Sequence, residues 1–244
     1  MKEVHLFYAP DVESTLELPS DEATHAVRVL RMQAGDEIVV TDGKGYFYEC
    51  VIASTSTKHC SVEIVTKTCG EELWRGKIQL AVAPTKNNDR MEWFAEKATE
   101  IGINDIHFVC CANSERKVVK TERFEKIVMA ATKQSHKAFL PQVHDMQPFK
   151  AFIKQPFEGQ KFIAHCYDDV PETDNAKPFL ADVLQTDGQT LVMIGPEGDF
   201  SIEEVQMAIK AGFQPINLGR SRLRTETAAL VAVHLMYLAK RNKW

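Results

Sequence analysis

The sequence has no apolar run long enough to cross a membrane. None of its stretches reaches the roughly 18 uninterrupted apolar residues that a membrane-spanning helix needs. Its first residues, MKEVHLFYAPDVES, also lack the cationic start, apolar stretch and small-residue cleavage site of a secretory signal. We therefore expect a soluble, cytoplasmic protein. Its 244 residues, 44% of them hydrophobic, suffice to bury one large core or two smaller ones.

Metal-binding motifs are missing as well. The six cysteines contain no C-x-x-C pair, and no histidine stands at zinc-finger spacing from them. Free cysteines are usually buried, and they stay reduced in a reducing compartment. The sequence therefore predicts structural thiols, and it indicates no metal site.

The chain also lacks an excess of positive charge, since its formal net charge is −5. Residues 1–70 hold 11 of the 34 acidic and 6 of the 29 basic residues, which leaves 23 of each sign for the rest. RNA would therefore have to be bound by local basic patches. The best patch in the sequence contains Arg116 and Lys117, although a solvated helix-entry face would explain the same charge run.

The pattern of predicted strands and helices changes near residue 70. Before it, short and closely spaced strands and the hairpin signal Asp42-Gly43-Lys44-Gly45 predict a small β-barrel. After it, helices alternate with uninterrupted apolar strands, which predicts a parallel sheet covered on both faces. We therefore predict two domains, 1–70 and 71–244, the second with an α/β fold. Its helix over 89–102 is expected to bury Trp93 in the core.

In the α/β part, the loop IGPEGDFS follows an apolar strand. Gly195 and Gly198 expose main-chain groups, and the proline between them stiffens the turn. Ser201 and Glu204 predict a capping box that begins the next helix. Glu197 would repel a phosphate, which favours a neutral or cationic ligand. An ordinary strand-to-helix turn is the alternative interpretation.

A second loop, LGRSRLR, precedes a helix that is expected to begin at Thr225. Its arginines at 220, 222 and 224 would present a phosphate-binding edge beside the helix N-terminus. A solvated basic loop paired with carboxylates such as Glu226 is the alternative. Because ligands of open α/β sheets lie outside the carboxyl ends of the strands, we expect both loops to share one cleft. Neither loop has the glycine pattern of a P-loop or of a dinucleotide fold, which disfavours a nicotinamide dehydrogenase.

Five stretches now carry a family resemblance: IGPEGDFS, LGRSRLRTETAAL, KATEIGI, SERKVV and HAVRVLRMQAGDEI. With them, the sequence resembles the RsmE family of 16S rRNA (uracil-N3)-methyltransferases, which belong to the SPOUT class of S-adenosyl-L-methionine-dependent enzymes. The resemblance implies a PUA-like RNA-binding β-barrel in 1–70. It implies an α/β methyltransferase domain with a parallel sheet and a deep trefoil knot in 71–244. It also implies a homodimer and 16S rRNA, within the small ribosomal subunit, as the substrate.

The resemblance assigns expected roles to particular residues. The S-adenosyl-L-methionine site would be formed by His165, Ile194, Gly195, Pro196, Glu197, Gly198, Leu218, Gly219, Leu223 and Thr225. Arg224 would stabilise the uracil anion and Glu226 is a candidate proton acceptor, although a carboxylate in a first helical turn also suits the helix dipole. RNA contacts are expected at Arg28, Arg31, Lys44, Arg116, Lys117 and Arg222. His165 would otherwise be a hydrogen-bonded histidine at a strand end.

The sequence departs from the family pattern in both C-terminal motifs, and also in KQSHK at 133–137, where Lys137 stands for an arginine. Asp199 stands where the family usually has the last glycine of GPEGG, and Ser221-Arg222 replaces an Arg-Ile pair in the second motif. A SPOUT methyltransferase for another RNA such as tRNA, or an RNA-binding module without catalysis, are the alternative functions.

Overall fold

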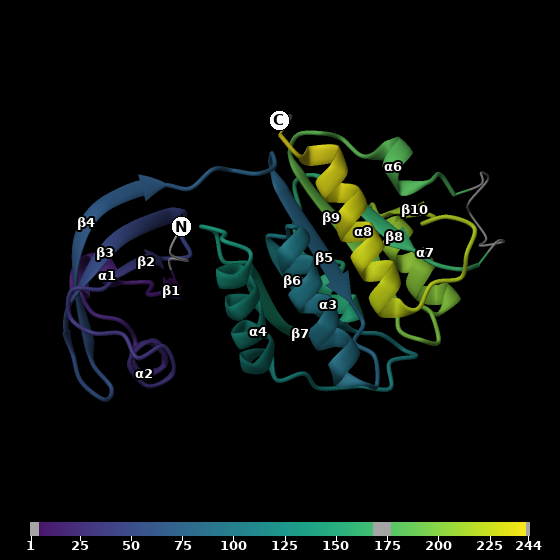
Figure 1. The fold of residues 1–244 in the computed structure, drawn as a ribbon. Coiled ribbons are helices and arrows are strands. Elements are labelled where there is room, and N and C mark those ends of the chain that lie inside the picture. Colours follow the sequence, from purple (N-terminus) through teal and green to yellow (C-terminus); the bar gives the residue numbers. More distant parts are fainter. Residues whose placement is uncertain (1–4, 168–176, 243–244) are drawn as a thin grey trace. The chain divides into compact units, whose positions relative to one another are not determined.

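The computed structural model describes residues 5–167 and 177–242, and the chain divides into two compact units (Figure 1). The first unit comprises Met1–Glu71 together with Met129–Leu140, and the second comprises Glu72–Val128 and Pro141–Trp244.

The first unit is built on a four-stranded sheet of order β1-β2-β3-β4. Its strands are β1 (Leu6–Tyr8), β2 (Glu37–Thr41), β3 (Tyr46–Thr55) and β4 (Cys60–Cys69). Strand β1 runs parallel to β2, whereas β2, β3 and β4 form antiparallel hairpins. Residues 16–18 pair with the opposite edge, where Leu18 N donates to Cys60 O over 2.9 Å. The chain therefore passes from one edge of the sheet to the other, which is how a small sheet begins to close.

The predicted hairpin signal is the turn between β2 and β3. Gly43 and Gly45 adopt φ of +69° and +115°, a region that side chains rarely tolerate. The Asp42 carboxylate accepts from the main-chain N–H groups of Lys44 and Tyr46 over 2.7 and 3.1 Å. Helices α1 (Val12–Thr15) and α2 (Ser20–Thr24) and the π-helical turn η1 (His25–Val29) complete the unit.

The second unit confirms the predicted α/β fold with a parallel sheet. The strand order is β10-β8-β9-β5-β6-β7, and every neighbouring pair is parallel. The strands are β5 (Lys77–Val82), β6 (Asp105–Cys110), β7 (Gln142–Pro148), β8 (Gln160–Ala164), β9 (Gln189–Ile194) and β10 (Gln214–Ile216). Strand β9 is thus inserted between two strands that precede it in the chain.

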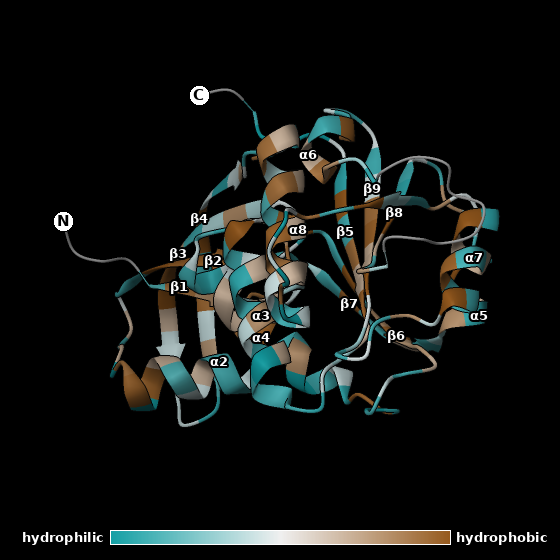
Figure 2. Ribbon diagram, turned by 90° about the vertical axis from the view of Figure 1, so that its right-hand side faces the viewer, coloured by the Kyte–Doolittle hydropathy of each residue, from teal (hydrophilic) through white to brown (hydrophobic). Residues whose placement is uncertain are grey.

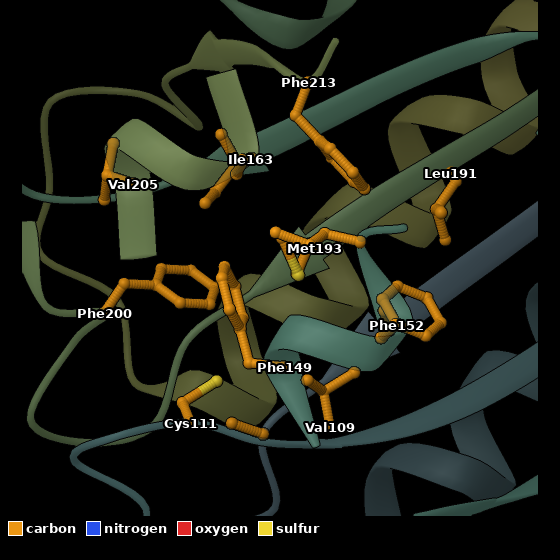
Figure 3. Packing of buried hydrophobic residues seen from close by; sticks show 14 residues of the cluster. Val109, Cys111, Phe149, Phe152, Ile163, Leu191, Met193, Phe200, Val205 and Phe213 are labelled. Atoms are coloured by element: carbon orange, nitrogen blue, oxygen red, sulfur yellow. The ribbon is translucent and has the colours of Figure 1, made fainter. Parts of the chain in front are cut away.

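Helices cover both faces of this sheet. Helix α3 (Asn88–Ile101) packs beside α8 (Thr225–Lys240) on one face (Figure 1). The short helix α5 (Phe149–Phe152) and α7 (Ile202–Lys210) share a hydrophobic core with the strands on the other face. In that core the rings of Phe149 and Phe200 lie against each other with centroids 5.9 Å apart (Figure 3). The remaining helices are α4 (Thr121–Gln134), whose last residues belong to the first unit, and the short α6 (Leu180–Val183).

The prediction that Trp93 belongs to the core is wrong, because this side chain is 44% exposed. Helix α3 buries Met91, Phe94, Ala95 and Ala98, which form one stripe at helical spacing, and position 93 falls outside it. The helix ends as predicted at Gly102, whose φ is +136°.

Helix α8 has several brown, hydrophobic segments (Figure 2), and it buries Ala229, Ala232, Val233 and Met236. Its last residue, Lys240, is fully buried, and the amine donates to the carbonyl oxygens of Gln185, Asp187 and Gly188. Burial lowers the pKa of this amine. Within the described residues, no helix has both the length and the hydropathy to cross a membrane.

Candidate active site

The carboxyl ends of three adjacent strands lie at one level of the sheet. Ile194 at the end of β9 is in register with Val82 of β5 on one side and with Ala164 of β8 on the other. The loops that follow these strands therefore start side by side, and Gly195 and His165 are brought to the same edge. This is the edge where ligands of parallel α/β sheets bind.

The two loops singled out in the sequence are joined directly at this edge. The Thr225 hydroxyl, at the start of α8, donates to the Gly195 carbonyl over 3.1 Å, and Thr225 is buried. Position 195 is tightly packed, because a Cβ atom there would lie 3.0 Å from the Phe200 ring, which would have to give way slightly. The two loops therefore lie side by side at this edge, joined by a hydrogen bond to the main chain.

The GPEG loop is also fastened to the loops that follow β5 and β6. The Glu197 carboxylate accepts from the main-chain N–H of Lys86 over 3.0 Å. The Asn113 amide donates to the carbonyls of Gly198 and Asp199, each over 3.1 Å. A Cβ atom at position 198 would approach Cβ of Asn113 to 3.2 Å. Glu197 thus helps to hold the loop in place. The predicted capping box of Ser201 and Glu204 is confirmed at the start of α7.

Asp199 shows how this chain accommodates its departure from the family pattern. Its φ is +61°, the left-handed region in which glycine is the usual residue. Its carboxylate accepts from the main-chain N–H of Phe200 over 2.7 Å and from that of Cys166 over 2.8 Å. The side chain therefore offsets its own backbone strain and ties the GPEG loop to the end of β8.

His165 is a buried histidine whose two ring nitrogens have no hydrogen-bond partner among the described residues. Burial lowers the pKa of its imidazole to about 4, helped by the charge of Lys177 and opposed by Asp199. The ring is therefore neutral at pH 7 and offers one donor and one acceptor. Since buried polar atoms are nearly always paired, the ring nitrogens indicate that a polar ligand group belongs beside them.

The LGRSRLR loop is held by hydrogen bonds from Asn217, which also link it to Lys177. The Asn217 amide donates to the Lys177 carbonyl over 2.5 Å, and the oxygen of the same amide accepts from Gly219 N–H over 3.0 Å. Gly219 adopts a φ of +112°. The Lys177 amine in turn donates to the carbonyls of His165 and Tyr167 over 2.7 and 2.6 Å. Leu218 and Leu223 are half-buried in this loop.

The start of α8 carries the two predicted catalytic residues in opposite environments. Arg224, the N-cap residue, is exposed, and no partner of its guanidinium appears among the residues described. Glu226 is 8% exposed; its Oε1 lies 3.8 Å from Nε of Arg90, and its buried Oε2 has no partner within the described part of the chain. A buried oxygen without a partner is available to a proton or to a bound group.

The residues expected to bind RNA are placed in different ways. Arg28, Arg31, Lys117 and Arg222 are exposed. The Arg116 side chain binds the protein's own main chain, because its guanidinium donates to the carbonyls of Thr85 and Lys86. Lys44 donates to the Pro10 carbonyl over 2.8 Å and lies 3.4 Å from the Asp11 carboxylate.

Four residues that shape this edge were not predicted from the sequence: Arg90, Asn113, Lys177 and Asn217. Asn113 and Asn217 follow strands β6 and β10, and a search for polar side chains after predicted strands would have found them. Arg90 and Lys177 had no such signal, because a helix side chain and a loop side chain reach the site only through the tertiary fold.

These features define a class of protein: an α/β domain with main-chain loops joined at the carboxyl ends of its parallel strands, accompanied by a small β-sheet unit. The family follows from the sequence as a whole. Residues 72–237 match the RNA methyltransferase domain, and residues 18–65 match the RNA methyltransferase PUA domain. The chain belongs to this RNA methyltransferase family.

Several known proteins are similar along nearly the whole chain. Ribosomal RNA small subunit methyltransferase E of Bacillus subtilis is 28% identical over 230 residues, which covers 90% of this chain and 88% of that protein. The crystal structure of a probable rRNA-methyltransferase from Porphyromonas gingivalis is 42% identical with a TM-score of 0.89, covering 97% of this chain and 98% of that one. Ribosomal RNA small subunit methyltransferase E from Neisseria gonorrhoeae, bound to S-adenosyl methionine, is 28% identical with a TM-score of 0.82 and 95% coverage of both chains. The predicted family is thereby confirmed.

Proposed function

We propose that this protein methylates N3 of a specific uridine in 16S rRNA, with S-adenosyl-L-methionine as the methyl donor. The observation that carries the proposal is the joined pair of loops at the carboxyl edge, with the His165 nitrogens beside them unpaired among the described residues. The chain is also similar over 90% of its length to ribosomal RNA small subunit methyltransferase E of Bacillus subtilis. The N-terminal part, 1–70, acts as the RNA-binding domain and 71–244 as the methyltransferase domain.

The residues at the edge fit this cofactor. The main chain of 194–198 and 218–219 offers hydrogen-bonding groups without covering side chains, and Thr225 fixes the spacing of the two loops. The half-buried Leu218 and Leu223 would hold the adenine, and the neutral imidazole of His165 would supply a donor and an acceptor to the cofactor's polar groups. When bound, S-adenosyl-L-methionine supplies an electrophilic methyl group on a sulfonium.

The protein's own groups must then expose and activate the uracil. The base is taken out of the RNA stack, as in other enzymes that act on a base. The exposed guanidinium of Arg224 stabilises the negative charge that develops on the uracil as N3 loses its proton. The unpaired Oε2 of Glu226 accepts that proton, and the Arg90 guanidinium near Oε1 holds the carboxylate in place. The remaining acceleration comes from positioning.

RNA is held through phosphate contacts. We assign these to the exposed side chains of Arg28, Arg31, Lys117 and Arg222. Arg116 and Lys44, whose nitrogens already donate to main-chain carbonyls, contribute positive charge to the same purpose. Such contacts weaken with rising salt, so RNA affinity should fall steeply with ionic strength.

The resemblance also supports two features of assembly. We propose that 71–244 contains a deep trefoil knot and that the protein is a homodimer with the knots at the interface. Light scattering after size exclusion tests the dimer, and a mass of one chain across the working concentration range would contradict it.

The proposed reaction is tested on 16S rRNA from a strain that lacks the gene. Mass spectrometry of the digested rRNA should show loss of one N3-methyluridine, and a plasmid copy of the gene should restore it. Retention of that nucleoside in the deletion strain would overturn the assignment. Loss of a methylated uridine from tRNA instead would favour the alternative substrate.

A further inference from the structure

The opposite half of the same sheet carries an unusual band of polar side chains. Strands of parallel sheets are normally apolar on both faces. Here Asp105 and His107 project from one face of β6, because they are two residues apart. The register pairs His107 with His144 of β7 and Asp105 with Gln79 of β5, which puts all four side chains on that face.

These four side chains form two hydrogen-bonded pairs in direct contact. His144 Nε2 lies 2.7 Å from Asp105 Oδ1, and His107 Nε2 lies 3.1 Å from Gln79 Oε1. The two imidazole rings stack at 4.1 Å with an angle of 7° between their planes. One ligand atom from each of Asp105, His107 and His144 falls within 4.8 Å of the others.

The surroundings orient this group and give access to it. The Gln79 amide donates to Gln189 Oε1 over 3.0 Å, so its oxygen is the atom turned towards His107. A cavity of about 240 Å³ opens beside Gln79 and His107 and is walled by Phe152, Phe157 and Phe213. A small ion therefore has a route to the histidine and room for a bound water.

We propose that Asp105, His107 and His144 bind a divalent transition-metal ion of the zinc type, with the Gln79 amide oxygen as a further donor. Two imidazoles and one carboxylate are ligands that zinc accepts, whereas magnesium and calcium prefer oxygen alone. To bind the ion, each neutral ring takes the tautomer with its proton on Nδ1, which the proton reaches through solvent, so that Nε2 offers a lone pair. The rings turn about their Cβ–Cγ bonds so that both lone pairs meet the ion. Adjacent strands of a sheet fix the backbone of all the donors.

The ion is structural rather than catalytic. Asp105 and Gln79 lie at the amino-terminal ends of β6 and β5, whereas the GPEG and LGRSRLR loops follow the carboxyl ends of β9 and β10. Zinc that cross-links β5, β6 and β7 should raise the melting temperature of the protein, because it binds the folded chain alone.

The test is a titration of untagged, chelator-treated protein with zinc chloride, followed by calorimetry and by thermal denaturation. We expect one ion per chain and a melting temperature that rises with zinc. His144→Gln retains an N–H donor for Asp105 but removes the imidazole ligand, and it should weaken zinc binding by at least about tenfold. Asp105→Asn is a second, nearly isosteric variant with the same expectation, and His234→Gln, on the exposed side of α8, is the matched control.

Cobalt(II) distinguishes this site from the free cysteines. A spectrum without a thiolate charge-transfer band supports nitrogen and oxygen ligands, whereas such a band assigns the ion to cysteine and overturns the proposal. Two other results would also overturn the proposal. One is a wild-type protein whose melting temperature does not rise with zinc, and the other is a folded His144→Gln protein that binds zinc as the wild type does. None of these readouts uses methyl transfer, so they stand apart from the test of the proposed function.

Discussion

The binding sites proposed at the two ends of the parallel sheet are of different kinds. At the carboxyl end, glycine loops present main chain, and side chains such as Asn113 and Asp199 act by fixing that main chain. At the amino end, the proposed ligand atoms belong to single side chains that project from neighbouring strands. A main-chain site needs several consecutive residues, because each of them must leave the backbone of the loop uncovered. A side-chain site needs only one residue from each strand. The first kind is therefore visible as a motif and the second is not.

The largest effect is expected from Arg224→Ala, which removes the proposed cation from the carboxyl end. Loss of one group that stabilises transition-state charge should lower methyl transfer by at least about 100-fold. Affinity for S-adenosyl-L-methionine, measured by calorimetry, should stay unchanged, and so should zinc binding at the amino end. The exposed Arg220 on the same loop provides the control, as Arg220→Ala. A variant with normal activity would remove Arg224 from the mechanism.

A second prediction concerns the stability of the protein at low pH. The pKa of His165 is lowered from 6.5 to about 4 in the folded protein, chiefly by burial. Between these values the unfolded chain binds a proton that the folded protein does not, so stability is retained above pH 6.5 and falls as the pH drops towards 4. The loss reaches at most about 3 kcal/mol. Urea denaturation at several pH values should show a shallower fall for His165→Gln and the wild-type slope for His234→Gln. Equal slopes in all three proteins would contradict a neutral His165.

Gly195→Ala tests whether the main chain itself is the binding surface. A methyl group at this position would lie 3.0 Å from the Phe200 ring and 3.2 Å from its main-chain nitrogen, so the loop must shift. We expect a loss of about 1 to 3 kcal/mol, divided between the free energy of unfolding and the affinity for S-adenosyl-L-methionine. Thermal denaturation and calorimetry measure the two parts. Ser221→Ala, in the exposed part of the second loop, should change neither; an unaltered Gly195→Ala protein would argue against a rigid loop.

The smallest effect is expected from Asp199→Gly, which restores the residue usual in the family. Glycine relieves the strain at a φ of +61° but loses the bonds to Phe200 and Cys166. The two effects oppose each other, so stability should change by less than about 1 kcal/mol and methyl transfer should persist. A collapse of activity would show that the Asp199 carboxylate does more than hold the loop.

The sequence predicts the local features of this protein well. The turn at Asp42-Gly43-Lys44-Gly45, the end of α3 at Gly102 and the capping box at Ser201 each depend on residues within one turn. Their chemistry is decided by neighbours along the chain, which a sequence shows directly.

Features that depend on register or on packing are not accessible in this way. The insertion of β9 between β8 and β5 is set by long-range pairing. The spacing of Asp105 and His107 in DIHFV does place both on one face, but nothing in the sequence puts His144 beside them. Trp93 was misplaced because spacing alone did not tell which stripe of α3 would face the sheet.

The division of the chain has a practical consequence for dissecting the protein. The first unit contains residues 129–140, which lie far from the rest of it in the sequence. Ala138 accepts from Gly45 N–H over 3.0 Å, and Lys133 neutralises the buried carboxylate of Glu22 over 2.5 Å. A fragment cut after residue 71 would strand that carboxylate without its counter-ion. Chimeras between relatives should therefore exchange 129–140 along with the N-terminal segment.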